Sequence, residues 1–88
     1  MRITTMEEGE KVIKNILFVI KQQRKKKGLS INELSQRCGF APETLKLIET
    51  DEKELVLSEL ITIANGLGMK ILELVKLADK KTKGSQNN

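Results

Sequence analysis

The sequence has 88 residues and a formal net charge of +4, which is enough chain for one small domain with a thin core. It has no histidine and a single cysteine, Cys38, which excludes an intrachain disulfide and leaves too few ligands for a zinc site. No nucleophile–base pair or phosphate-binding loop is present, so we expect no enzyme, no catalytic residues, no metal and no cofactor.

The first predicted element is one long helix. Residues 1–7 are expected to be a flexible N-terminus, and the helical pattern starts at about Glu8. A polar run from Lys21 to Lys27 completes the helix, and Gly28 ends it. The apolar residues at i, i+3, i+4 and i+7 predict a buried stripe of Ile13, Ile16, Leu17 and Ile20, with Val12, Phe18 and Val19 off that stripe.

Two short helices follow. Ser30 is a strong N-cap, and Glu33 three residues later completes a capping box, which predicts a helix over Ile31–Cys38 that ends at Gly39. Pro42 suits the first turn of a helix, so the next helix is predicted to run from Pro42 to about Thr50.

Two further helices are predicted after an acidic connection at residues 51–54. The first covers about Leu57–Gly66 and the second about Lys70–Lys80. Residues 81–88 are polar and are expected to be a disordered tail. The sequence therefore predicts an all-α domain of five helices over residues 8–80.

The stretch from Ser30 to Glu49 has the pattern of a helix-turn-helix. In this arrangement the first helix braces across the DNA backbone and the second lies in the major groove, which is wide enough to admit a helix. The turn between them must be tight, and Gly39 supplies the positive φ that such a turn needs. We expect Leu34 and Cys38 to pack against Leu45 and Ile48.

From about Ile16 to Leu74 the sequence resembles the Cro and phage-repressor type of helix-turn-helix, the XRE family. The resemblance rests on the joint spacing of Arg24, Gly28-Leu29-Ser30, Glu33-Leu34, Gly39, Thr44-Leu45, Ile48-Glu49, Ile63-Ala64 and Leu67-Gly68. It implies a lambda-repressor-like five-helix fold and a dimeric regulator that binds short palindromic DNA operators. It also implies a role for each matching position.

By that resemblance, Arg24 and Glu49 match a buried ion pair that ties the first helix to the end of the recognition helix. Ser30 and Ile31 match the start of the bracing helix, which contacts phosphate. The positions that match the recognition residues are Pro42, Glu43, Thr44, Lys46 and Leu47.

Several of these residues depart from the family's usual pattern. Many relatives have glutamine at the position of Ile31. The isoleucine side chain cannot donate a hydrogen bond to phosphate. Leu47 offers only apolar contact, and Lys46 is the one strong candidate for guanine or phosphate. Residues 43–59 hold six carboxylates and two lysines, a net charge of −4 on a segment that would approach a polyanion.

These departures leave two hypotheses for function. The first is a sequence-specific DNA-binding transcriptional regulator, either repressor or activator. The second is a degenerate helix-turn-helix module, antitoxin- or antirepressor-like, that binds a protein through Ile31 and Leu47 and no longer binds DNA.

Other features also leave alternatives open. Lys25, Lys26 and Lys27 form either a DNA-facing patch or a solvated helix end. Glu43 either reads cytosine or favours the first turn of its helix, and Cys38 is either a redox switch or, as we favour, a small core residue.

The expected partners are a DNA operator, a second copy of the chain and possible protein partners, with no membrane. Apolar residues off the core stripes predict a homodimer through the fifth and first helices, with a surface of Leu72, Leu77, Val12, Phe18 and Val19. The chain lacks a long apolar segment and a secretory pattern, so we expect a cytoplasmic protein.

Overall fold

The computed structural model describes the backbone of residues 5–86 and the side chains of residues 8–81. Over this range the chain forms five α-helices and no strand, as predicted. The helices are α1 (Thr5–Lys26), α2 (Ile31–Cys38), α3 (Pro42–Glu49), α4 (Leu57–Gly66) and α5 (Ile71–Gln86).

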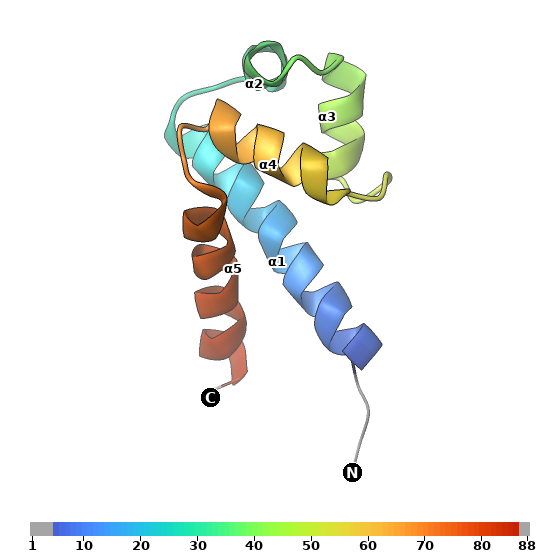
Figure 1. Ribbon diagram of the computed structural model, residues 1–88, viewed down its shortest axis with the longest axis vertical. Helices are drawn as coiled ribbons and strands as arrows, with labels where there is room; N and C mark the ends of the chain where they lie inside the picture. Colours follow the sequence, from blue (N-terminus) through green and yellow to red (C-terminus); the bar gives the residue numbers. More distant parts are fainter. Residues whose placement is uncertain (1–4, 87–88) are drawn as a thin grey trace.

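The long helix α1 is the spine of the fold. Figure 1 shows α4 crossing in front of α1, with α2 and α3 gathered at one end of the molecule and α5 running beside α1 toward the other end. The free ends of α1 and α5 diverge below α4, so the front of the molecule is V-shaped there. This arrangement leaves α3 on an outer edge of the domain.

A single apolar core lies where α4 crosses α1. Ile20, Leu34 and Ile63 are fully buried and come from three different helices, so the crossing of α1, α2 and α4 is packed without solvent between the helices. The other buried apolar side chains are Ile16, Leu17, Val19, Leu45, Ile48, Leu60, Ala64, Leu67, Leu74 and Ala78.

Two predictions for α1 were wrong. Ile13 continues the core stripe but is 45% exposed, because the covering helices end before they reach it. Val19, expected to lie off the stripe, is only 2% exposed. Helix α5, which packs extensively against α1, covers this second side of the helix. The buried face of α1 is therefore wider than a single stripe.

The predicted ends of the outer helices were also wrong. Helix α5 continues past Lys80 to Gln86, so residues 81–86, predicted to be disordered, are helical. Lysines near a helix C-terminus favour this extension, because they lie at the negative end of the helix dipole. Helix α1 starts at Thr5, so residues 5–7 are also helical. Residues 1–4 and 87–88 of the predicted flexible ends lie outside the described residues.

Gly66 allows α4 to approach α2 closely. A Cβ atom at this position would lie 2.8 Å from Cys38 Sγ and 3.1 Å from Leu34 Cδ1, closer than atoms pack without a shift. We expect Gly66→Ala to lower the free energy of unfolding by about 1–3 kcal/mol. Chemical denaturation measures the change.

Two further variants check this explanation. Cys38→Ala removes the sulfur, so the double variant should be more stable than Gly66→Ala alone. Gly9→Ala is the matched control, because nothing lies within 4 Å of a Cβ at that helical position. A Gly66→Ala variant as stable as the parent would contradict the close packing of α2 and α4.

Ser35 is the one buried side chain in the described part of the structure whose polar atom has no hydrogen-bond partner. Its residue is 0% exposed and lies on α2. Ser35→Ala removes this unsatisfied hydroxyl and raises helix propensity, so we expect about 1 kcal/mol of added stability. Thermal unfolding should show a rise of about 4–8 °C. Ser58→Ala on exposed α4 surface is the control and should change little.

Candidate functional site

The N-terminus of α2 is fixed by a capping box. Ser30 Oγ accepts a hydrogen bond from the Glu33 backbone N–H at 3.0 Å, and the Ser30 N–H donates to Glu33 Oε1 at 2.8 Å. The hydrogen bond that the Glu33 carboxylate accepts from the Ser30 backbone N–H, and next the one from the Ser30 side chain, hold the pKa of Glu33 below its usual value. The cap leaves Ser30 exposed at the end of α2, where the remaining free backbone N–H groups suit an anion.

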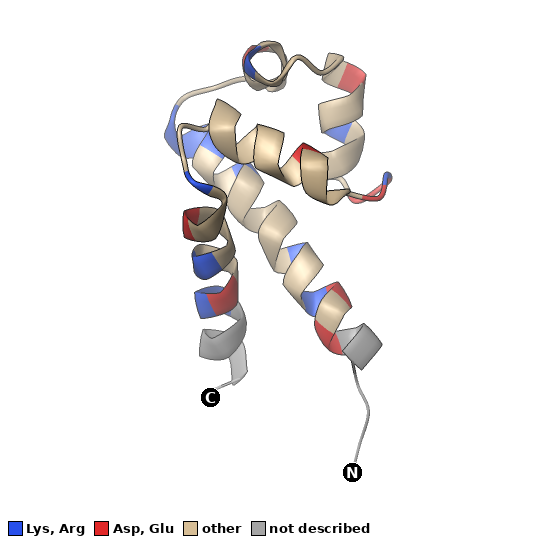
Figure 2. Ribbon diagram, in the orientation of Figure 1, with Lys and Arg blue, Asp and Glu red and all other residues tan. Residues whose placement is uncertain are grey.

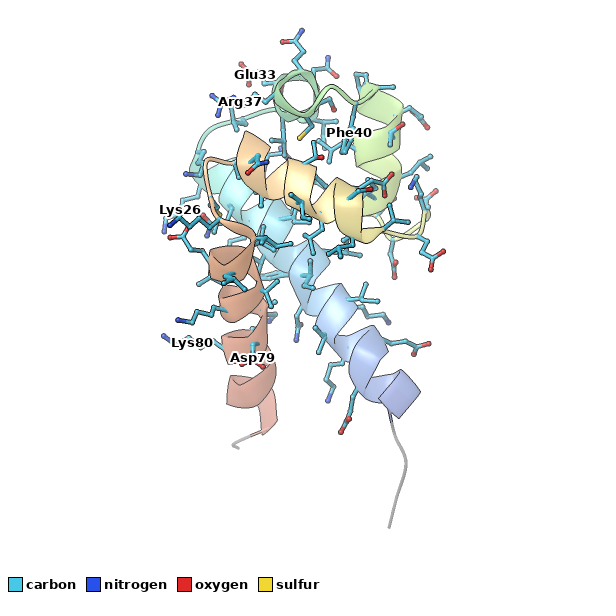
Figure 3. The ribbon with its side chains drawn as sticks, viewed as in Figure 1. Lys26, Glu33, Arg37, Phe40, Asp79 and Lys80 are labelled. Carbon is cyan, nitrogen blue, oxygen red and sulfur yellow. The ribbon has the colours of Figure 1, made fainter. Side chains whose placement is uncertain are left out.

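The turn between α2 and α3 is three residues long. Gly39 has φ of +75° and caps α2, while the Phe40 N–H donates to the Ser35 carbonyl at 2.9 Å. Phe40 is half-buried and packs against the core, which anchors the turn (Figure 3). The turn therefore sets the direction in which α3 leaves α2.

Helix α3 divides into a buried side and an exposed side. Leu45 and Ile48 are fully buried, whereas Pro42, Glu43 and Lys46 are exposed. Two other predicted recognition residues are half-buried, Thr44 and Leu47. The face that α3 presents to a ligand therefore has Lys46 and Glu43 as its charged groups.

Arg24 joins α1 to the end of α3 through a buried ion pair with Glu49. Arg24 Nε donates to Glu49 Oε2 at 2.8 Å and Nη2 donates to Glu49 Oε1 at 3.1 Å. Arg24 Nη1 also donates to the Leu29 carbonyl at 2.8 Å. The two side chains are 10% and 4% exposed. This contact, implied by the family resemblance, fixes α3 against α1 and is not part of the exposed face.

The connection between α3 and α4 is acidic and tightly folded. Asp51 follows α3 with φ of +62°, in the left-handed region. Lys53 Nζ lies 2.7 Å from Glu59 Oε2, and this partner, together with the Val56 N–H, holds the pKa of Glu59 below its usual value. Sequence reasoning missed this pair, although Glu59 occupies the third position of α4, where a side chain reaches back toward the chain before the helix.

The charges of this connection are not balanced locally. Lys53 is engaged by Glu59, so it does not neutralise the exposed Asp51, Glu52 and Glu54. Figure 2 shows acidic residues in this connection on one side of the molecule and lysines at the turn after α1 on the opposite side, while α5 carries residues of both signs. Lys26 is the last residue of α1 and lies next to that turn (Figure 3).

Two predicted contact residues lie partly in the core. Ile31 is half-buried and packs against the core, so its side chain supports α2 more than it projects outward. Cys38 packs against α4, with Sγ 3.7 Å from the Thr62 carbonyl oxygen, and it lies against the apolar core that includes Leu45 and Ile48. Burial raises the pKa of the Cys38 thiol, so it stays protonated near neutral pH and fits a packing role.

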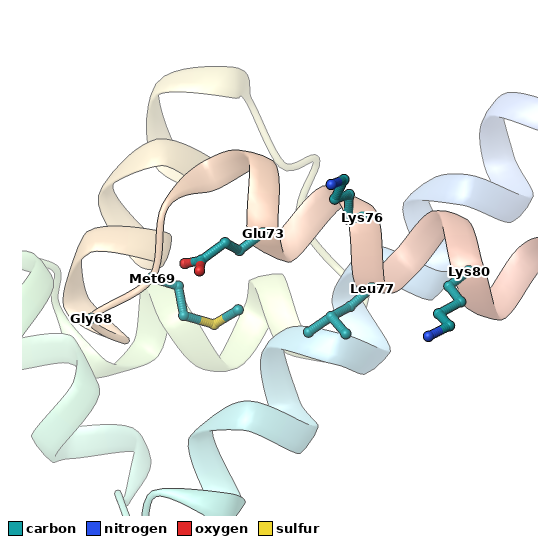
Figure 4. Close-up of a pocket in the computed structure, with 6 residues that line it drawn as sticks. All are labelled: Gly68, Met69, Glu73, Lys76, Leu77 and Lys80. Carbon is teal, nitrogen blue, oxygen red and sulfur yellow. The ribbon is translucent and has the colours of Figure 1, made fainter.

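The predicted dimer surface on α1 and α5 does not form one patch. Val19 is buried and Val12 is half-buried, so neither offers the expected contact. Leu77 lines a hollow of about 720 Å³ with Gly68, Met69, Glu73, Lys76 and Lys80 (Figure 4). Leu72 does not line this hollow. Five residues along a helix separate two side chains by about 140°, so Leu72 and Leu77 lie on different sides of α5.

The comparisons with known proteins agree with this geometry. Residues 20–74, more than half of the chain, match the family model HTH_3, described as helix-turn-helix. The chain belongs to this family. Its relationship to the XRE-type helix-turn-helix, first indicated by the sequence, is thereby confirmed. No curated protein matches the sequence.

The solved structures of two other proteins share the fold. The restriction-modification controller protein C.Esp1396I has 22% identity and a TM-score of 0.78, over 83% of this chain and 95% of that chain. The clp gene regulator ClgR from C. glutamicum has 20% identity and a TM-score of 0.71, over 80% of this chain and 91% of that chain. At this level of identity the likeness shows a common fold.

In the part of the chain that the structure describes, no group of three or more His, Cys, Asp or Glu side chains is arranged to hold a metal ion. None of the described helices combines the length and the apolar character needed to cross a bilayer.

Proposed function

We propose that this helix-turn-helix protein is a sequence-specific regulator of transcription that binds double-stranded DNA with α3 in the major groove. The observation that carries the proposal is the division of α3, which buries Leu45 and Ile48 and exposes Lys46 and Glu43, together with the capped N-terminus of α2. In a helix-turn-helix the second helix lies in the major groove, and the first helix contacts the phosphates.

Each predicted residue has a role in this proposal. Lys46 contacts a guanine edge or a phosphate, Glu43 accepts from a cytosine amino group, and Thr44 and Leu47 contact bases at the edge of the helix. Pro42 starts α3 without a backbone donor. Ser30 and Ile31 place the free backbone N–H groups of α2 next to a phosphate.

We further propose that the regulator acts as a homodimer in the cytoplasm. A single α3 reads only a few base pairs, and a two-fold dimer doubles its contacts on a palindromic operator. Of the two proteins of similar fold described above, one is named as a controller protein and the other as a gene regulator, which supports a regulatory role.

The alternative is a protein-interaction module that has lost DNA binding, and the acidic α3–α4 connection is the observation that favours it. The two functions differ in their response to salt. DNA binding weakens steeply as salt is added, because binding releases counterions from the phosphates. An apolar protein contact does not show this dependence.

Fluorescence anisotropy with a pool of random duplex DNA, at low and moderate salt, tests the proposal. We expect binding that weakens as salt is added. On an operator selected from this pool, Lys46→Ala should weaken binding by about 1–3 kcal/mol. Lys11→Ala is the matched control, since it removes the same charge from an exposed position on α1. Absence of binding at low salt, or equal losses in both variants, would overturn the assignment of α3 as the DNA-reading helix.

A further inference from the structure

One face of α1 carries lysines on both sides of a single aromatic side chain. The residues of this face recur at steps of three and four along the helix, and all of them are exposed: Lys11, Lys14, Phe18, Lys21 and Lys25. Residues at these steps lie on the same side of a helix, here over about 21 Å. We call these residues the basic stripe.

The basic stripe faces away from the apolar core. Phe18 is two residues from both Ile16 and Ile20, which are buried, so its side chain points about 160° away from theirs. No acidic residue occurs in the sequence over residues 11–27, and Glu10 is the acidic neighbour at the start of the stripe. Figure 2 shows blue along the described part of α1 and red only near its start.

Phe18 lies where three segments of the chain meet. Its ring is 49% exposed, and Lys81 Nζ of α5 lies 4.5 Å from the ring centre, in a cation–π contact. Next to the ring is a hollow of about 370 Å³, which Leu17 of α1 borders together with Thr50 and Asp51 after α3. The ring and the hollow therefore offer an apolar contact point in the middle of the lysines.

The charges around the hollow determine which kind of partner fits. Lys14 and Lys21 line it from α1, whereas Glu49, which also lines it, is engaged in the buried ion pair. Asp51 is the exposed carboxylate at its border. A nucleic acid carries phosphates along its whole length and would bring some of them next to Asp51. A peptide can instead place carboxylates opposite the lysines and an apolar side chain opposite Phe18.

We propose that the basic stripe is a docking site for an acidic helix of a partner protein, with an apolar residue of that helix packed on Phe18 and in the hollow. A helix suits this surface because its own side chains recur at the same steps of three and four residues. Neither Glu43 nor Lys46 borders the hollow, so the docking site is separate from the residues proposed to read DNA.

Fluorescence anisotropy of a labelled peptide with the full chain tests the proposal. The probe is a synthetic helical peptide of about 18 residues, about 27 Å long, with glutamates along one face around a central leucine. The control peptide has the same composition, but its leucine lies on the opposite face. We expect the control peptide to bind about tenfold more weakly, because its leucine cannot reach Phe18 while its glutamates meet the lysines.

Substitutions in the protein then show where the probe binds. Phe18→Ser and the double variant Lys14→Glu/Lys21→Glu should each weaken binding of the probe by about tenfold or more. Lys76→Glu/Lys80→Glu is the matched control, since it reverses the same charge at exposed positions of α5, and at moderate salt its effect should stay within about threefold. Circular dichroism checks that each variant is folded.

Several outcomes would overturn the docking site. They are equal binding of the two peptides, no binding of the probe at low salt, and equal losses in the stripe and control variants. A loss of duplex DNA binding in Lys14→Glu/Lys21→Glu that exceeds the loss in the control variant would also do so, because the stripe would then contact DNA. Lys46→Ala should leave binding of the probe unchanged. Binding of the probe without any DNA binding would instead contradict the proposed function alone.

Discussion

Replacing Glu49 with alanine is expected to lower the free energy of unfolding by about 3–5 kcal/mol, because it leaves the Arg24 guanidinium buried without its counter-charge. The carboxylate accepts two bonds from Arg24, at 2.8 and 3.1 Å, and its side chain is only 4% exposed. For a domain of this size such a loss corresponds to a fall in Tm of about 12–40 °C. Thermal and denaturant unfolding measure it.

A double-mutant cycle separates the ion pair from ordinary packing. Arg24→Met/Glu49→Leu removes both charges and keeps apolar volume, so it should be more stable than Glu49→Ala. Arg24→Met alone also loses the bond to the Leu29 carbonyl, and it leaves the Glu49 carboxylate buried without its counter-charge. Additive effects of the two single changes would show that the pair is not energetically coupled.

The pair also bears on function because it connects the helix that reads DNA to the rest of the domain. Glu49 is the last residue of α3, and Arg24 lies in the last turn of α1. If the proposed function is right, the double variant should fold and still bind DNA less tightly, because α3 is held less firmly in its direction.

Local signals in the sequence predicted most of the fold. The capping box at Ser30 and Glu33, the glycine at position 39 and the proline at position 42 each determine backbone geometry within a few residues. For this reason the ends of α2 and α3 were placed to within one residue. The joint spacing of the family positions then implied the contact between Arg24 and Glu49.

The features that were missed depend on contacts between distant segments. The burial of Val19 depends on where α5 lies against α1, and the exposure of Ile13 depends on where the covering helices end. The contact of Cys38 with α4 depends on the close approach that Gly66 allows. None of these distances follows from helical periodicity, which gives only the direction of a side chain around its own helix.

The acidic connection after α3 is expected to limit DNA affinity, so removing its charge should strengthen binding. Asp51 and Glu52 are exposed directly after α3, and the adjacent Lys53 is engaged by Glu59. Carboxylates at the C-terminal end of a helix also oppose its dipole. The variant Asp51→Asn/Glu52→Lys should therefore bind duplex DNA about 10- to 100-fold more tightly at low salt, with a steeper dependence on salt.

The choice of substitutions keeps other properties constant. Asparagine tolerates the left-handed conformation of residue 51, where φ is +62°. Glu8→Gln/Glu10→Lys is the matched control, since it changes the net charge equally on the exposed start of α1. If the position of the charge close to α3 matters, only the Asp51→Asn/Glu52→Lys variant should show a steeper dependence on salt. The slope of the logarithm of the binding constant against the logarithm of the salt concentration should then grow by about 0.9 for each added phosphate contact. Equal gains in both variants would mean that net charge alone acts, and no gain in either would place the acidic connection away from DNA.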